Sequence, residues 1–150
     1  MKIVLQVVEE ASVEVDKKVI GEIGKGYLIL VGVFETDEEE NALKLADKVS
    51  KLRVFPDENG KTNLSLKDVG GKILSVSQFT LCADLNGCNR PSFSLAAKRD
   101  KAIRLYELFN KQLENNGFEV QTGEFGADMQ VHILNDGPVT IVMDSNVLKN

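Results

Sequence analysis

Two short apolar runs near the end of the sequence, Met129 to Leu134 and Val139 to Met143, are separated only by Asn135-Asp136-Gly137-Pro138. Apolar residues mark alternate positions in each run, which is typical of β-strands. An X-Pro peptide bond adopts the cis form at a cost of only about 0.5–1 kcal/mol, and glycine leaves the backbone uncovered. The Gly-Pro pair therefore predicts either an ordinary hairpin turn or a corner that offers a bare carbonyl to a ligand.

The whole sequence predicts one α/β domain over residues 1–150, with about seven strands and two helices. A first helix is predicted from Asp37, capped by Thr36, and a second from Arg99 to Asn115. Tight turns between strands favour antiparallel pairing, so we expect compact, mostly antiparallel, barrel-like sheets with the helices layered against them (β/β/α). The predicted strand segments are Lys2–Val15, Val19–Ile23, Tyr27–Phe34, Lys72–Phe79 and the two C-terminal runs.

Composition and missing motifs exclude several classes of function. No apolar run approaches the roughly 20 residues of a membrane helix, and the start lacks the features of a signal peptide, so we expect a cytoplasmic protein. Cys82, Cys88 and the single histidine, His132, do not form a zinc motif, and phosphate-binding glycine loops are missing. We therefore expect an enzyme, if it is one, to work without metal, cofactor or membrane.

The charge of the chain argues against broad binding of a nucleic-acid backbone. The formal net charge is −5, whereas backbone binding draws on many lysines and arginines. Contact with a nucleic-acid end, where few phosphates are touched, is not excluded by this charge. The basic residues between Lys98 and Arg104, and those between Lys48 and Arg53, fall on predicted helices, where a solvated face is the usual explanation.

Polar residues close the apolar strand that begins at Lys72, in the order Ser77-Gln78-Phe79-Thr80-Leu81. A strand end holds side chains and backbone amides at a fixed point, as an acyl-transfer site requires. Gln78 is able to donate a hydrogen bond to a carbonyl oxygen, while Thr80 fits a nucleophile, a residue that positions water, or a plain strand residue. Arg90-Pro91-Ser92-Phe93 adds a cation on a loop, and its role is equally open from the residues alone.

Four motifs resemble those of the bacterial D-aminoacyl-tRNA deacylases, namely Ser77–Leu81, Arg90–Phe93, Phe125–Val131 and Asn135–Thr140. The similarity extends over nearly the whole chain. It implies a homodimeric hydrolase that cleaves the ester between a D-amino acid and the 3′ adenosine of tRNA, and that also removes glycine. It further implies a Gly-cis-Pro loop that reaches across the dimer into the pocket of the partner.

The resemblance also implies roles for individual residues. The catalytic group is Thr80, Gln78 and Phe79, and the group for substrate binding and chiral selection is Gly137, Pro138, Ser77, Met129, Asn135 and Thr140. A stiff backbone wall beside the α-carbon collides with an L side chain and accepts a D side chain or glycine, which is selection by exclusion. We hypothesise that the Phe79 and Thr80 amides hold the carbonyl oxygen while water attacks, helped by the 2′-hydroxyl of the substrate. A competing hypothesis makes the Thr80 hydroxyl the nucleophile.

The sequence departs from the family pattern at one place. Many relatives carry Gln-Arg-Val near the start and a second arginine soon after, where this chain has Val7 and Glu10. The sequence therefore leaves open which residues support the Gly-Pro loop. Two other functions also fit the residues, a tRNA-binding module that has lost turnover and a threonine-dependent amidohydrolase that acts on small D-peptides.

Overall fold

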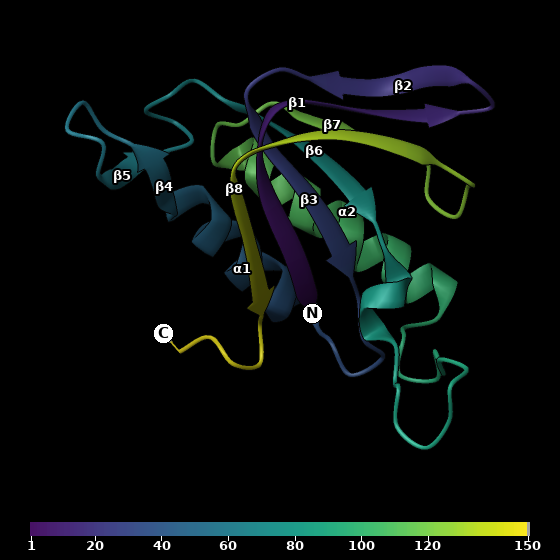
Figure 1. Ribbon diagram of the computed structural model, residues 1–150. Coiled ribbons are helices and arrows are strands. Elements are labelled where there is room, and N and C mark those ends of the chain that lie inside the picture. Colours follow the sequence, from purple (N-terminus) through teal and green to yellow (C-terminus); the bar gives the residue numbers. More distant parts are fainter. Residues whose placement is uncertain (150) are drawn as a thin grey trace.

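The computed structural model describes residues 1–149, and its centre is a six-stranded sheet in the order β2-β1-β3-β6-β7, with β8 paired to β1 (Figure 1). The strands of this sheet are β1 (Lys2–Val15), β2 (Lys18–Ile23), β3 (Gly26–Gly32), β6 (Lys72–Ser77), β7 (Val120–Thr122) and β8 (Gln130–Asp144). A separate hairpin joins β4 (Arg53–Pro56) to β5 (Thr62–Ser65). The helical elements are α1 (Glu39–Lys51), the 3-10 turn η1 (Phe79–Cys82) and α2 (Arg99–Asn115).

Strand β1 pairs with three other strands because its two halves have different neighbours. Its first half pairs with β3, its second half pairs with β2, and β8 follows it along most of its length. The sheet therefore curls over itself (Figure 1) and encloses two apolar clusters. The larger cluster packs the sheet against α1 and α2, with members such as Ile3, Leu5, Ile29, Leu45 and Phe109. The smaller one fills the curl with Val8, Val13, Leu28, Leu74 and Val76.

Two of the strand pairings are parallel, so the sheet is mixed and the expectation of mostly antiparallel, tightly turned strands holds only in part. β3 pairs in parallel with β6, and β6 with β7. The connection from β3 to β6 contains α1 and the β4–β5 hairpin, and that from β6 to β7 contains η1 and α2. Long crossovers of this kind return the chain to the same end of the sheet, as parallel pairing requires.

The predicted element boundaries are correct for α2 and wrong for α1. α2 runs from Arg99 to Asn115, as the helical spacing of its apolar residues predicts. α1 begins two residues later than expected, because the capping residue is Glu38, whose amide donates to Asn41 Oδ1 at 2.7 Å. Asp37 instead accepts a hydrogen bond from the Phe34 amide at 2.7 Å and contacts the amino group of Met1. Thr36 is therefore not the cap.

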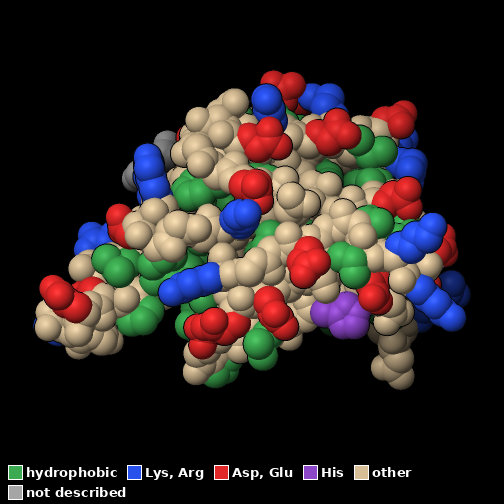
Figure 2. Space-filling view, turned by 90° about the horizontal axis from the view of Figure 1, so that it is seen from above, with side chains coloured by type: hydrophobic (Ala, Val, Ile, Leu, Met, Phe, Trp, Pro, Cys, Tyr) green, Lys and Arg blue, Asp and Glu red, His purple; other side chains and the backbone are tan. Residues whose placement is uncertain are grey.

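The described residues show neither a membrane helix nor a cluster of metal ligands. No helix within residues 1–149 is long and apolar enough to cross a membrane. Within the same residues, no three His, Cys, Asp or Glu side chains come together in a way that could hold a metal ion. Acidic and basic side chains are interspersed across the face shown in Figure 2, so that face presents no continuous basic surface to a phosphate backbone.

Candidate functional site

The junction between β6 and η1 forms the floor of the candidate site. The Gln78 amide donates to the Val31 carbonyl of β3 at 2.7 Å and fixes the start of the turn. The strand predicted to reach Phe79 stops at Ser77, because η1 begins at Phe79. The Phe79 and Thr80 amides open this turn and have no acceptor among residues 1–149, as is usual for the first amides of a helical turn. Two adjacent N–H groups are therefore available to an oxygen atom of a ligand.

A buried contact from α2 holds this floor in place. The Tyr106 hydroxyl donates to the Ser75 carbonyl at 2.7 Å, two residues before the end of β6. Burial raises the pKa of the Tyr106 hydroxyl above its ordinary value, so Tyr106 remains a neutral donor at physiological pH. The strand end is thus fixed both by its neighbour β3 and by the helix that covers it.

The side chains at the junction connect two of the motifs predicted from the sequence. Gln78 Nε2 donates to Thr80 Oγ1 at 2.5 Å. The Phe79 ring is 54% exposed and meets the edge of the Phe93 ring, with 4.9 Å between the ring centroids. Arg90 lies exposed, three residues before Phe93. The Arg90–Phe93 motif therefore contacts the junction through the Phe93 ring. In the described part of the chain, no carboxylate or histidine contacts the Thr80 hydroxyl.

A cavity of about 450 Å³ adjoins this junction, within the size range of small-ligand sites. Four of the predicted site residues line it together, namely Ser77, Gln78, Phe79 and Met129. Thr80 reaches it through its hydrogen bond with Gln78. The remaining lining residues come from β6, from the loop before α2 and the start of that helix, and from the segment that leads into β8, and they are Val76, Ala96, Ala97, Arg99, Ala102, Phe125, Gly126, Ala127 and Val131.

Arg99 is a charged lining residue that the sequence did not predict for the site. As expected for a solvated helix face, Arg99 is exposed, and in addition it lines the cavity. Its guanidinium carbon lies 5.3 Å from the centroid of the Phe125 ring, within the range of a cation–π contact. Helical spacing carries no signal for this position, because α2 begins with Arg99 and the contact depends on a segment 26 residues further along the chain.

The Gly-Pro segment is part of one continuous strand, so the interpretation as a hairpin turn is wrong. Both apolar runs belong to β8 and pair with the same strand, β1. Asn135 lies opposite Val8 and Thr140 opposite Gln6, so residues 136–139 face Val7 alone and bulge out of the ladder. We call residues 136–139 the Gly-Pro bulge. Its Gly137–Pro138 peptide bond is cis, Gly137 has a φ of +117°, and both residues are exposed.

Side-chain amides close the base of the Gly-Pro bulge. Asn135 Nδ2 donates to the Val7 carbonyl at 2.9 Å and to the Val139 carbonyl at 3.1 Å. From the facing strand, Gln6 Nε2 donates to Thr140 Oγ1 at 3.2 Å and to Asn135 Oδ1 at 3.4 Å. Val7 therefore takes part through its backbone carbonyl. Support for the bulge comes from this amide network.

The surface of the Gly-Pro bulge is acidic. A hydrogen bond with Asp136, together with the negative charge of that residue, raises the pKa of the Glu9 carboxyl above its ordinary value. Because Asp136 precedes Gly137 directly, this pair places negative charge beside the exposed backbone of the bulge.

The structure does not bring the Gly-Pro bulge and its supports to the cavity within one chain. Neither Gly137 and Pro138 nor their supports Asn135 and Thr140 line the cavity that Ser77, Gln78, Phe79 and Met129 form. The bulge instead lies exposed at the bend of β8. Other exposed apolar side chains surround it on the same strand, namely Ile133, Leu134 and Val142.

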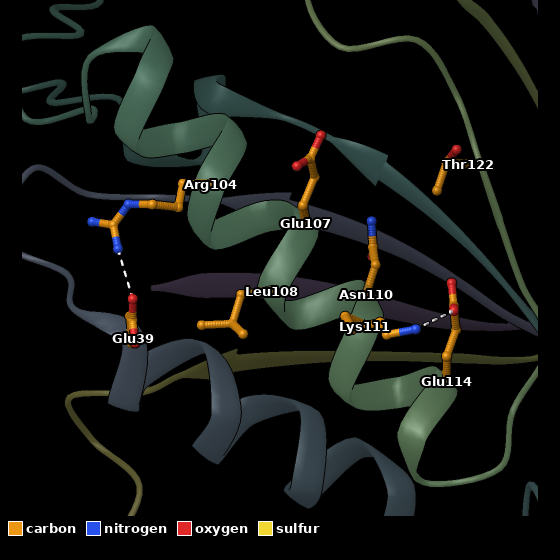
Figure 3. A pocket seen from close by; sticks show the side chains of 8 residues that line it. All are labelled: Glu39, Arg104, Glu107, Leu108, Asn110, Lys111, Glu114 and Thr122. Carbon is orange, nitrogen blue, oxygen red and sulfur yellow. Dashed lines mark hydrogen bonds and ion pairs between the residues drawn. The ribbon is translucent and has the colours of Figure 1, made fainter.

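A second hollow, of about 570 Å³, lies along α2 (Figure 3). It is lined mainly by charged side chains that neutralise one another, since Arg104 pairs with Glu39 at 2.9 Å and Lys111 with Glu114 at 3.7 Å. Its lining residues include neither free amides of a turn nor any residue predicted for the site. This hollow is therefore a charged helix surface rather than a reaction centre.

The comparisons with known proteins agree with the motifs. The family model described as D-Tyr-tRNA(Tyr) deacylase matches residues 4–144. A D-aminoacyl-tRNA deacylase of Lactobacillus gasseri is 57% identical over 96% of this chain and 99% of its own length. Its counterpart in Bacillus velezensis is 54% identical over 97% of this chain and 99% of its own length.

Two solved structures share the fold. One, described as c-Myc DNA unwinding element binding protein, is 41% identical and superposes with a TM-score of 0.90, covering 96% of this chain and 98% of its own. The other, described as a probable eukaryotic D-amino acid tRNA deacylase, is 15% identical with a TM-score of 0.82, covering 95% of this chain and 97% of its own. The chain therefore belongs to the D-Tyr-tRNA(Tyr) deacylase family.

Proposed function

We propose that this chain hydrolyses the ester bond of D-aminoacyl-tRNA in the cytoplasm, releasing the D-amino acid and free tRNA without metal or cofactor. The observation that carries this proposal is the junction at Phe79 and Thr80, where two backbone amides without an acceptor among residues 1–149 open beside a cavity of small-ligand size. Paired amides that face developing negative charge are the main device of acyl-transfer sites. Membership of the family supplies the class of ester.

In the proposed mechanism the Phe79 and Thr80 amides bind the carbonyl oxygen of the ester. Water adds to the carbonyl carbon, the oxygen gains negative charge, and the two amides stabilise it. The bond to the ribose oxygen then breaks, and that oxygen takes a proton as the tRNA leaves. The neighbouring 2′-hydroxyl of the substrate assists the proton transfer, because the described residues place no histidine or carboxylate against Thr80.

The Thr80 hydroxyl serves as a positioning group rather than as the nucleophile. It already accepts a hydrogen bond from Gln78 Nε2 at 2.5 Å. A threonine nucleophile needs a base that removes its proton, whereas the Gln78 amide nitrogen is only a donor. The pair therefore orients the Gln78 carboxamide toward the cavity, where it is able to contact the substrate.

Chirality is selected by the Gly-Pro bulge of a second copy of the chain. The bulge is exposed and does not line its own cavity, so it is free to enter the cavity of a partner. The apolar side chains beside it, Leu134 at 53% and Val142 at 63% exposed, offer a surface for the second copy. A backbone wall at the α-carbon would exclude L side chains while accepting D side chains and glycine.

One assay tests the activity and its stereochemistry together. The protein is incubated with D-Tyr-tRNA, L-Tyr-tRNA, Gly-tRNA and a free D-Tyr ester, and each hydrolysis rate is measured. We expect rapid loss of D-Tyr and slower loss of glycine from tRNA, with L-Tyr-tRNA left intact. Hydrolysis of neither tyrosyl-tRNA would reject the activity and favour a binding module. Equal hydrolysis of both would reject the chiral filter, and a preference for the free ester would favour a general amidohydrolase.

A mixing experiment tests whether the bulge acts across two copies. Gly137→Ala displaces the bulge and Ala127→Trp fills the cavity, so each variant alone should keep no more than about 1% of the wild-type activity. If the bulge works in the partner, a re-equilibrated equal mixture contains hybrid dimers with one intact site, and about a quarter of the wild-type activity returns. If the bulge serves its own cavity, or if the protein is a monomer, the mixture stays inactive.

A further inference from the structure

We propose that Arg99 binds the phosphate group on the 5′ side of the aminoacylated nucleotide. This inference rests on the proposed function and adds a residue that recognises the nucleotide rather than the amino acid. Arg99 is the first residue of α2 and lines the same cavity as Ser77 and Gln78. It brings a permanent positive charge to the site where the ester is held.

The position of the guanidinium is set by two residues of the segment before β8. Its central carbon lies 5.3 Å from the centroid of the Phe125 ring. Its Nη1 also packs over Gly126, since a Cβ atom placed on that glycine would lie only 2.6 Å away. Gly126 has a φ of +79°, a backbone conformation that glycine adopts without cost. The missing side chain at Gly126 therefore leaves room for the guanidinium against the cavity wall.

The hydrogen-bond donors of Arg99 are left for a ligand. Among residues 1–149, Arg99 forms no ion pair, although its helix neighbours Lys101 and Arg104 both pair with glutamates. The Glu35 carboxylate, which lies at the start of the same helix, accepts a hydrogen bond from the Lys98 amide at 2.9 Å. A guanidinium with free, planar donors suits a phosphate, which it binds through two parallel hydrogen bonds.

The position of the ester on the substrate indicates which phosphate Arg99 contacts. The ester is attached to the ribose of the terminal nucleotide, and the phosphate nearest to that ribose is the one on its 5′ side. A cation in the wall of the ester site is therefore placed for this group rather than for phosphates deeper in the tRNA stem. A single contact of this kind also suits a chain whose net charge is −5, because it requires no extended basic surface.

The test compares esters that differ only in the phosphate. The substrates are D-Tyr esterified to adenosine, D-Tyr esterified to adenosine 5′-monophosphate, and D-Tyr-tRNA. In the wild type, we expect kcat/KM to be higher for the monophosphate ester than for the adenosine ester. Arg99→Gln should lower the ratio of these two values about tenfold, mainly through KM, and Arg99→Lys should restore part of it. For D-Tyr-tRNA, the slope of log(kcat/KM) against log salt should become shallower by about 1 in Arg99→Gln.

Arg104→Gln is the matched control, because it removes the same charge from the same helix, where Arg104 lines the second hollow (Figure 3) and not the cavity. It should leave the ratio unchanged. Three results would overturn the proposal, namely an unchanged ratio in Arg99→Gln, an equal loss with all three substrates, or the same loss in Arg104→Gln. Failure of the wild type to hydrolyse any of the three esters would instead reject the proposed activity, so the two failures are distinguishable.

Discussion

The floor and the Gly-Pro bulge, the two halves of the proposed site, are built in opposite ways. The floor ends a strand that is buried on both sides, and it is tied to β3 and α2 by backbone and tyrosine hydrogen bonds. The bulge leaves the ladder between β1 and β8, is exposed, and is held at its base by side-chain amides. The floor therefore depends on the core of its own chain, whereas the bulge depends on a few polar contacts. The two halves should thus respond to different substitutions.

The largest effect should follow from Gly137→Ala. The new Cβ would lie 2.8 Å from Val139 Cγ2, and the φ of +117° is unfavourable for alanine. The bulge must shift, and a displacement of about 1 Å at a positioning group costs roughly 100-fold in rate. We expect kcat/KM for D-Tyr-tRNA to fall by that factor.

The control for this variant is Gly60→Ala in the β4–β5 turn. Gly60 also has a positive φ, of +76°, but a Cβ there would meet no other atom within 4 Å. It should cost stability alone, about 1 kcal/mol, and leave kcat/KM unchanged. A similar loss of activity in both variants would mean that the bulge has no special role.

Asn135→Ala should weaken selection more than chemistry. It removes the donor to the Val7 and Val139 carbonyls, so the bulge should move more freely while the floor keeps its contacts. We expect the D-Tyr to L-Tyr ratio of kcat/KM to fall roughly tenfold, with a loss of stability of about 1–3 kcal/mol.

Asn116→Ala provides the matched comparison for this variant. Its Nδ2 also holds two acceptors, Asp47 Oδ1 and Ser50 Oγ, each at 2.9 Å, but it joins α2 to α1. It should reduce the melting temperature (Tm) and leave the chiral ratio intact. If the two asparagine variants show the same D-Tyr to L-Tyr ratio of kcat/KM, Asn135 has no special role in chiral selection.

Thr80→Val should have a small effect on activity. Its hydroxyl accepts a hydrogen bond from Gln78 and has no base beside it in the described part of the chain, so turnover should stay within about threefold of the wild type. Loss of a true nucleophile costs more than about 10⁴-fold. Single-turnover kinetics with D-Tyr-tRNA separates these outcomes clearly, and a loss of the larger size would restore threonine as the nucleophile.

The smallest effect, confined to the bulge, should come from Glu9→Gln. The hydrogen bond and negative charge of Asp136 raise the pKa of Glu9 in the folded protein. The stability that this proton contributes is present below the ordinary glutamate pKa and is lost as the pH rises through the raised value. The variant should therefore show a slightly higher Tm than the wild type at pH 7 and the same Tm at pH 4. Glu10→Gln, one residue along, is the control, and an equal gain there would indicate a general charge effect.

The sequence predicts the floor better than the bulge because local patterns determine the floor. Helical spacing predicts α2 from Arg99 to Asn115, and polar residues after an apolar strand predict the position of Gln78 and Thr80. The bulge depends on Gln6, which meets Thr140 across 134 residues of sequence, and no local pattern encodes that distance. The sequence does not predict the place of Arg99 for the same reason, because its contact with Phe125 forms only in the tertiary structure. The parallel strand pairings were missed because they arise from long crossovers rather than from turns.

The continuity of β8 on either side of the Gly-Pro bulge has a consequence for how such a protein can change over evolutionary time. Because Leu134 pairs with Glu10 and Ile141 with Leu5, each flank has its own register along β1. Residues inserted or removed between the flanks would alter the reach of the bulge without shifting the inward or outward direction of any other side chain in the strand. The length of the bulge can therefore change while the paired flanks and the core stay constant, so the reach of the filter is separable from the fold that carries it.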